Sequence, residues 1–247
     1  MSLHLQMIGT GSAFSKKYYN NNALLRCNGF TLLIDCGVTA TRALDALKID
    51  LGQLDGVLIT HIHADHVGGL EEIAFQLLYV FRRRIKLLVP SLLKETLWIH
   101  TLKGGLENKE EGFCSLDDYF DVVVLEPHVP FPIAGREFTV ELVPTRHIPN
   151  KPSYSLYLNG KVFYSSDARF DPALLADFHR NRGCEAILHD CQLFEPGTVH
   201  ASLAELLTLP EDIQRKVLLM HYGDNKEEFE GKTGAMTFIE QGKIYRF

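Results

Sequence analysis

Four side chains that bind transition metals well lie close together in the segment Thr60–His66. They are His61, His63, Asp65 and His66. Because His61 and His63 are two positions apart, an extended segment turns both imidazoles to the same side. A turn after His63 would then bring Asp65 and His66 toward a second point nearby. Imidazole and carboxylate ligands suit zinc, and also manganese or iron, so the segment predicts a metal centre.

A catalytic metal ion takes about three protein ligands, so this segment needs partners from elsewhere in the chain. His147, Asp167 and His221 each come directly after a predicted strand. The ends of neighbouring strands meet at one edge of a sheet, and we therefore expect these three side chains to complete the centre. Each of these residues is weak evidence for a metal site when taken alone, since an Asp after a strand often only stabilises a turn.

Two further residues are candidates for proton transfer. His200 lies just before a predicted helix, and Asp190 follows another predicted strand. The ordinary pKa of histidine is near neutrality, which suits a general acid. The alternative is that His200 only caps the helix that follows it. Asp190 is a candidate for orienting the imidazole of His200.

The elements that must position these residues alternate between strand and helix patterns along the chain. The expected strands are residues 3–8, 23–27, 30–35, 56–60, 85–89, 122–125, 137–143, 153–158, 162–165, 186–189 and 217–220, with two short strands at the end. The expected helices are residues 41–47, 68–81, 92–102, 172–178 and 202–207 and a charged helix near 226–230. Residues 103–118 are polar and predict a mobile surface loop. No Pro/Ser linker divides the chain, so we expect one domain over residues 1–247, built of packed sheets with helices outside.

Composition narrows the class of protein. The 247 residues are 46% hydrophobic and 23% charged, with a net charge of −6, which is ordinary for a soluble globular protein. The acidic balance gives no general attraction for a long polyanion. No segment approaches the length of a membrane span, and residues 1–4 do not begin a signal peptide. The five cysteines form no C-x-x-C pair, which favours free thiols and a cytoplasmic location.

The motifs and their order resemble a known fold family. The matching segments are Gly9-Thr10-Gly11, Asn20-Asn21-Asn22, Leu33–Gly37, Thr60–His66, His147, Ser166-Asp167, His189-Asp190, His200-Ala201-Ser202 and Leu219-Met220-His221. Together they resemble the metallo-β-lactamase fold and, within it, the RNase Z-like branch. The resemblance implies an α/β fold, an αββα sandwich of two packed sheets with outer helices. It also implies a homodimer.

The resemblance also implies the ligand set. His61, His63 and His147 would hold one metal ion, Asp65, His66 and His221 the other, and Asp167 would bridge them. The ions would be two Zn²⁺, with Mn²⁺ or another divalent metal as the alternative. Such a pair can activate a hydroxide and bind a phosphoryl oxygen, so that phosphorus is attacked in line.

The leaving alkoxide of such a reaction needs a proton, and the resemblance places a histidine where His200 stands. Ala201 departs from the His-Ser-Thr segment typical of the branch, and Asp190 stands where the family more often carries Glu. We therefore expect His200, Asp65 and Asp190 to be the catalytic residues of a metal-dependent phosphoric diester hydrolase.

A missing segment bears on the substrate. RNases Z carry a tRNA-gripping arm between the residues that match His147 and Asp167, and here only 19 residues separate these two. The chain therefore resembles the armless anti-Pycsar-type phosphodiesterases, which implies hydrolysis of 3′,5′-cyclic nucleotides to linear monophosphates. We expect a small nucleotide substrate and neither a long nucleic acid nor a membrane as partner. The alternatives are an RNase Z-type tRNA 3′ endonuclease, a lactonase or thioesterase of the same fold, and a non-catalytic sensor.

Overall fold

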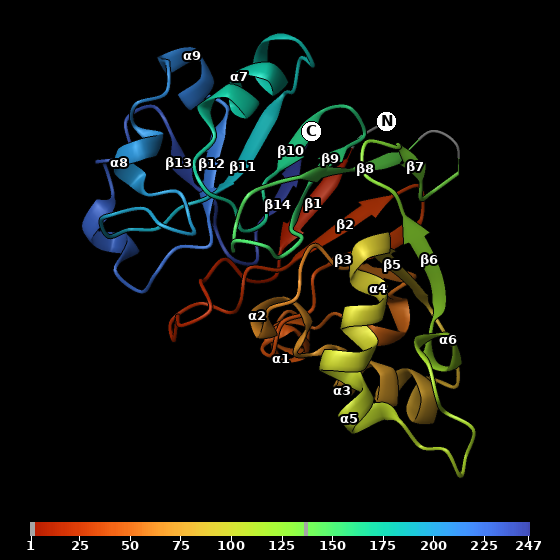
Figure 1. The fold of residues 1–247 in the computed structure, drawn as a ribbon. Coiled ribbons are helices and arrows are strands. Elements are labelled where there is room, and N and C mark those ends of the chain that lie inside the picture. Colours follow the sequence, from red (N-terminus) through yellow and green to blue (C-terminus); the bar gives the residue numbers. More distant parts are fainter. Residues whose placement is uncertain (1–2, 136–137) are drawn as a thin grey trace.

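Two β-sheets lie face to face in the middle of the molecule, and helices cover their outer faces (Figure 1). The computed structural model describes residues 3–135 and 138–247. Within these residues each sheet has seven strands. The αββα sandwich expected from the sequence is confirmed. Among the residues that the structure describes, every helix is too short or too polar to cross a lipid bilayer.

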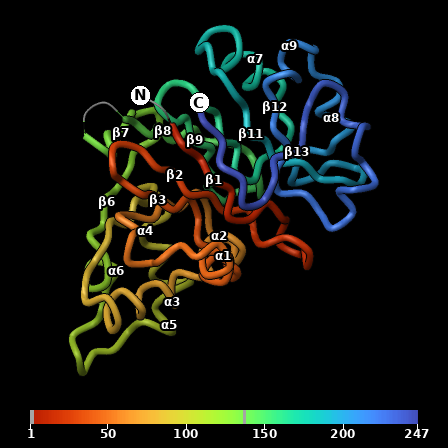
Figure 2. The backbone as a smooth tube through the Cα atoms, turned by 180° about the vertical axis from the view of Figure 1, so that it is seen from behind, coloured from red at the N-terminus to blue at the C-terminus, as the bar shows by residue number. Residues whose placement is uncertain are grey.

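The first sheet has the strand order β14-β1-β2-β3-β4-β5-β6. Its strands are β1 (His4–Met7), β2 (Ala23–Cys27), β3 (Phe30–Ile34), β4 (Gly56–Leu58), β5 (Lys86–Pro90), β6 (Asp121–Leu125) and β14 (Ile244–Arg246). Strands β3 to β6 are parallel, so their carboxyl ends share one edge. Strand β14 pairs with β1, which brings the two ends of the chain side by side (Figure 2).

The second sheet has the order β13-β12-β11-β10-β9-β8-β7. Its strands are β7 (Phe131–Pro132), β8 (Thr139–Pro144), β9 (Tyr154–Leu158), β10 (Val162–Tyr164), β11 (Ala186–Asp190), β12 (Val217–Met220) and β13 (Thr237–Phe238). Strand β9 runs antiparallel to β8 and β10, whereas β10, β11 and β12 are parallel. The carboxyl ends of β8, β10, β11 and β12 therefore lie at the same edge.

Short helices connect the strands. They are α1 (Ala40–Ala46), η1 (Leu51–Gln53), α2 (Ala64–Val67), α3 (Leu70–Phe75), η2 (Gln76–Phe81), α4 (Ser91–Leu97), η3 (Trp98–Leu102), α5 (Lys103–Leu106), α6 (Leu116–Tyr119), α7 (Pro172–Arg180), α8 (Leu203–Leu206), α9 (Glu211–Gln214) and η4 (Lys226–Phe229). Helices α1 to α5 lie on the side of the first sheet, and α7 to α9 lie on the side of the second (Figure 1).

Two hydrophobic clusters hold these layers together. The larger contains residues of both sheets, such as Leu33 and Val57 from the first and Leu156 and Leu188 from the second. Strand β9 is buried along its whole length, which is why its apolar residues do not alternate with polar ones. The smaller cluster lies between the second sheet and α7 to α9. Burial on both faces of the sheets leaves only their edges for a polar site.

Most of the element predictions agree with the structure, two differ, and one lies partly outside the described residues. The predicted surface loop 103–118 contains α5 and begins α6, because buried Leu106 and Leu116 anchor it to the core. The charged segment near 226–230 is only a single 3₁₀ turn. Strand β8 is described from Thr139 onward, so the predicted strand start at residue 137 lies outside the described residues. The cysteines are all free thiols in the described residues.

Candidate metal centre

The segment that follows β4 turns sharply at His63. His63 is extended (φ −129°, ψ 155°) and begins α2, which carries Asp65 and His66. The turn therefore separates the two pairs of ligands, as the spacing predicts. Gly37 permits this arrangement, because a Cβ on Gly37 would lie 2.0 Å from the carbonyl oxygen of Asp65. Only a residue without a side chain lets the end of β3 approach α2 so closely.

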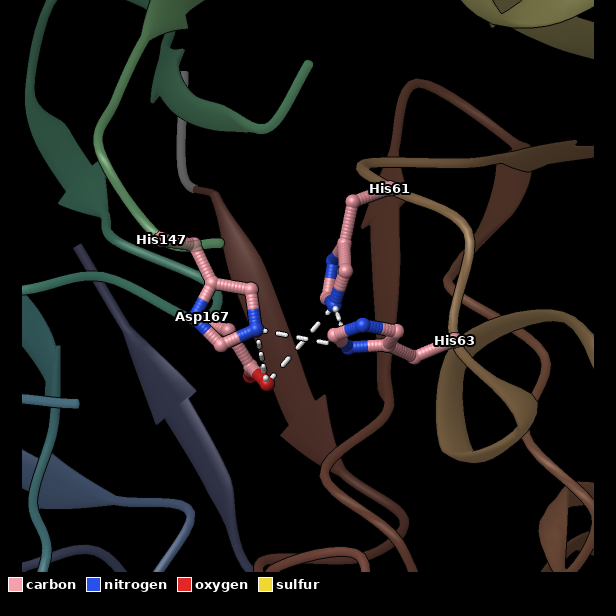
Figure 3. A group of neighbouring side chains, drawn as sticks. All are labelled: His61, His63, His147 and Asp167. Atoms are coloured by element: carbon pink, nitrogen blue, oxygen red, sulfur yellow. Dashed lines mark hydrogen bonds and ion pairs between the residues drawn. The ribbon is translucent and has the colours of Figure 1, made fainter. Parts of the chain in front are cut away.

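One group of donor atoms gathers His61, His63, His147 and Asp167 (Figure 3). The Nδ1 atom of His63 lies 3.1 Å from Nε2 of His61 and 3.3 Å from Nε2 of His147. The Oδ2 atom of Asp167 lies 3.6 Å from Nε2 of His61 and 3.7 Å from Nε2 of His147. All four side chains point toward one another from three separate parts of the chain.

A second group gathers Asp65, His66, His221 and again Asp167. Here the other carboxylate oxygen of Asp167, Oδ1, lies 3.2 Å from Nε2 of His66 and 3.4 Å from Nε2 of His221. The Oδ2 atom of Asp65 is 3.3 Å from His66 and 3.4 Å from His221. The carboxylate of Asp167 thus faces both groups, with one oxygen in each.

The donor sets fit divalent metal ions. Two ligand atoms bound tetrahedrally to a zinc ion at ordinary bond lengths are about 3.3 Å apart, which is close to the separations within both groups. Within the described residues, the buried atoms His66 Nε2 and Asp167 Oδ1 make no hydrogen bond. Buried polar atoms without hydrogen-bond partners are rare, so the convergence of these two atoms on one point indicates that a metal ion binds there. The chemistry of the set, imidazole with carboxylate, suits zinc or manganese.

The protonation states of the first group also suit a cation. Burial lowers the pKa of His61 well below its ordinary value, and the nearby imidazoles act in the same direction. Burial lowers the pKa of His63 and of His147 as well. These rings therefore present unprotonated nitrogens, the form that binds metal. Burial opposes ionisation of Asp167, but His221 and His66 hold its pKa well below the usual range.

Several of the expected ligands are themselves held in place by hydrogen bonds. The Nδ1 atom of His147 lies 2.8 Å from the carbonyl oxygen of Val199, which leaves Nε2 to face the group. The Nδ1 atom of His66 lies 2.8 Å from Oδ2 of buried Asp35. Asp35 also accepts hydrogen bonds from the backbone amide and the hydroxyl of Thr60, each at 2.8 Å. Such partners fix the orientation of metal-binding imidazoles.

Sequence reasoning did not single out Asp35 as a functional residue. The signal was present, because Asp35 directly follows β3, as Asp167 follows the strand β10. Its backbone lies in the left-handed region (φ 58°), as do those of Ser166 (φ 51°) and His221 (φ 59°). Strained backbone of this kind is found at functional sites, where the surrounding packing enforces it.

The three consecutive asparagines Asn20, Asn21 and Asn22 support the loops of the site. The Oδ1 atom of Asn22 accepts a hydrogen bond from the amide of Gly37 at 3.0 Å, and its amide donates to the carbonyl of Asp65 at 3.3 Å. All three side chains are buried. They therefore hold the loops that carry the donor atoms and do not line an open pocket.

Asp190 and His200 lie beside the two groups. The Nδ1 atom of His200 is 2.6 Å from Oδ2 of Asp190, and Nδ1 of His221 is 3.1 Å from Oδ1 of the same carboxylate. Burial opposes protonation of His200, but Asp190 outweighs it and raises the pKa of His200 above its ordinary value. The side chain is about one-fifth exposed, and among the described residues its Nε2 atom makes no hydrogen bond.

All of the residues predicted from the sequence thus meet at one edge of the sandwich. Seven form the two donor groups that share Asp167, and the remaining two, Asp190 and His200, adjoin them. Asp190 contacts both His200 and His221, so it holds one candidate proton donor and one candidate metal ligand in place. The prediction that His200 only caps a helix is not favoured, because Ser202 is the residue that caps α8.

Asp35→Asn should weaken metal binding by about 10- to 100-fold, because the neutral amide no longer stabilises the Nδ1 proton of His66. Competition with a chromogenic chelator measures this affinity. Asp45→Asn, an exposed position on α1, is the matched control and should keep the wild-type affinity. Equal affinities in the two variants would show that Asp35 has only a structural role.

Comparisons with known proteins identify a matching sequence family, a similar relative and solved structures of similar fold. The sequence family described as "Anti-Pycsar protein Apyc1" matches residues 3–245. An anti-Pycsar protein Apyc1 of Paenibacillus xerothermodurans is 60% identical over 247 residues, which covers 100% of this chain and 98% of the relative. Among solved structures, the metallo-β-lactamase fold protein YhfI of Bacillus subtilis has a TM-score of 0.77 at 18% identity and covers 100% of both chains. The short form of human tRNase Z has a TM-score of 0.68 at 18% identity over 98% of both chains.

Proposed function

Because the chain belongs to the anti-Pycsar protein Apyc1 family, we propose that this metal-dependent phosphoric diester hydrolase opens small 3′,5′-cyclic nucleotides to linear monophosphates. The observation that carries the proposal is the carboxylate of Asp167. Its two oxygens belong to separate donor groups, and the imidazole of His200 lies next to both groups. This is the arrangement that hydrolysis of a phosphodiester with a poor leaving group requires.

Two divalent cations, preferably zinc, would be held by the chain's own residues. His61, His63 and His147 would bind one ion, Asp65, His66 and His221 the other, and Asp167 would bind both. When bound, the cations would lower the pKa of a water molecule and withdraw charge from the phosphoryl oxygens. Asp65 contributes to catalysis as a member of this set, since its Oδ2 atom faces the Nε2 atoms of His66 and His221.

His200 is the proposed proton donor for the leaving group. In the balanced reaction, the oxygen of water bonds to phosphorus and one P–O bond to the ribose breaks. The alkoxide takes a proton from His200, and the proton released by the water restores His200. The Nδ1 atom of His200 is engaged by Asp190, so the proton to be transferred is carried on Nε2. The raised pKa of His200, caused by Asp190 against the effect of burial, keeps that proton in place near neutral pH.

The surroundings of the site favour a small substrate. The residues between His147 and Asp167 form the tight hairpin of β9 and β10, whose turn lies at Asn159-Gly160 with positive φ at both residues. This hairpin leaves no arm for gripping tRNA. The basic run at residues 82–84 ends η2, and Arg83 and Arg84 pair with Asp55 and Asp121. These contacts support a small nucleotide as substrate over a long nucleic acid.

The substrate prediction is tested by incubating zinc-loaded protein with cAMP, cGMP, cCMP and cUMP. We expect at least one to be converted to the linear monophosphate, as seen by chromatography, and a chelator to stop the conversion. A precursor tRNA and an acyl-homoserine lactone serve as competing substrates. Four intact cyclic nucleotides beside a cleaved tRNA or an opened lactone would contradict the proposal.

A further inference from the structure

A cavity of about 440 Å³ opens directly beside the first donor group. His61, His63 and His147 form one end of it. One wall comes from α4 and η3, and the opposite wall comes from the loop that runs from Ile148 to Ser153. Its volume lies in the range of about 300 to 1,000 Å³ that is typical of small-molecule sites. A hollow of about 540 Å³ between α1 and η2 is larger, but it includes no residue of the donor groups.

The lining of this cavity combines an apolar surface with unused polar groups. Ile62, Leu93 and Ile148 supply the apolar part. Within the described part of the chain, the side chains of Thr96, His100 and Thr101 have no hydrogen-bond partner, and those of Asn150 and Lys151 on the facing loop have none either. No Asp or Glu lines the cavity, whereas Lys151 and the histidines do. The surface therefore suits a flat, partly apolar ligand with polar edges and a negative charge.

The helix on the cavity wall is irregular where it faces the cavity. Helix α4 ends at Leu97, and residues 98–102 continue as the π-helical segment η3. Leu97, Trp98 and Leu102 remain buried, whereas His100 and Thr101 line the cavity. A π-helical turn is less stable than an α-helical one and is found frequently at functional sites. Its effect here is to add two polar side chains to the wall beside the donor groups.

We propose that this cavity binds the nucleoside half of the substrate, with His100 and Thr101 as residues that determine substrate affinity and specificity. The inference rests on the proposed function, since it assigns the part of the nucleotide that the donor groups do not contact. The phosphodiester lies at His61, His63 and His147, and the base packs on Ile62 and Leu93. The polar edge of the base and the ribose hydroxyl then face His100, Thr101 and the loop at Asn150.

The experiment compares two substrates in four proteins: the wild type, two cavity variants and a control variant. A 3′,5′-cyclic nucleotide carries a base and a ribose, whereas methyl p-nitrophenyl phosphate carries no nucleoside. In His100→Ala and Thr101→Val, the ratio of kcat/KM for the cyclic nucleotide to kcat/KM for the methyl ester should fall about tenfold, because binding groups for the nucleoside are lost. The loss should fall on KM for the cyclic nucleotide, with bound metal at the wild-type level.

His128→Ala is the matched control, since His128 is an exposed histidine that does not line the cavity. It should keep the wild-type ratio. An unchanged ratio and an unchanged KM in both cavity variants would overturn the assignment of the cavity while leaving the proposed function intact. A wild-type protein that cleaves the methyl ester but no cyclic nucleotide would instead overturn the proposed function.

Discussion

Asp167→Asn should lower kcat/KM for a cyclic nucleotide by about 10⁴-fold or more, since it removes the one carboxylate that faces both donor groups. The amide keeps one oxygen but presents an NH₂ group in place of the other. One donor group therefore gains hydrogen atoms where it had a lone pair, and the negative charge between the two groups is lost. Steady-state assays together with elemental analysis of bound metal measure the effect.

Asp65→Asn separates the shared role of Asp167 from a general effect of lost charge. Asp65 belongs to only one group, so this variant should keep about one metal ion per chain, whereas Asp167→Asn should keep less than one. The control variant Asp45→Asn, at an exposed position, should retain the wild-type metal content. If Asp167→Asn kept the full metal content and turnover, Asp167 would not be a bridging ligand.

His200→Ala should lower kcat for a cyclic nucleotide by about 10²- to 10⁴-fold, the usual contribution of a general acid. The loss should be below about tenfold for bis(p-nitrophenyl) phosphate, because p-nitrophenolate leaves without a proton. The contrast between the two leaving groups distinguishes proton donation from positioning. It is measured as kcat for both substrates at saturating concentration, with bound metal determined on the same samples.

His128→Ala provides the control for His200→Ala, since it removes an exposed imidazole away from the donor groups. This variant should leave kcat unchanged for both the cyclic nucleotide and bis(p-nitrophenyl) phosphate. Equal losses of His200→Ala on the two substrates would assign His200 to binding instead of proton transfer. Loss of bound metal in His200→Ala would place His200 among the metal ligands. This role can be tested because His200 lies close to Asp167 and His221.

Local sequence patterns were sufficient for the parts of the site that depend on neighbouring residues. The two-residue spacing of His61 and His63 and the turn before Asp65 are local features, and α2 begins at Ala64 with His63 as its N-cap residue. The Asn28-Gly29 turn also predicts the hairpin of β2 and β3, and both turn residues have positive φ. The conformation of a two-residue hairpin turn depends mainly on the two turn residues themselves, so the sequence predicts the hairpin there.

Long-range packing decided the remaining features. The surface-loop prediction for residues 103–118 was wrong at both ends, because polar composition does not reveal that Leu106 and Leu116 reach the core. The contact between Asp35 and His66 joins the end of β3 to α2, which follows the neighbouring strand β4. The π-helical turn of η3 also follows from packing, since no spacing of apolar residues distinguishes it from a continued α-helix.

The sequence by itself determined which donor atoms this protein carries and that they lie at the ends of strands. The family resemblance implied that Asp167 is shared, but only the tertiary structure decided the geometry, with one oxygen of Asp167 in each group and Asp190 between His200 and His221. The physical reason is that residue type and spacing act over one turn of chain. The direction in which a carboxylate points depends instead on partners from other parts of the chain, such as His66 and His221 for Asp167.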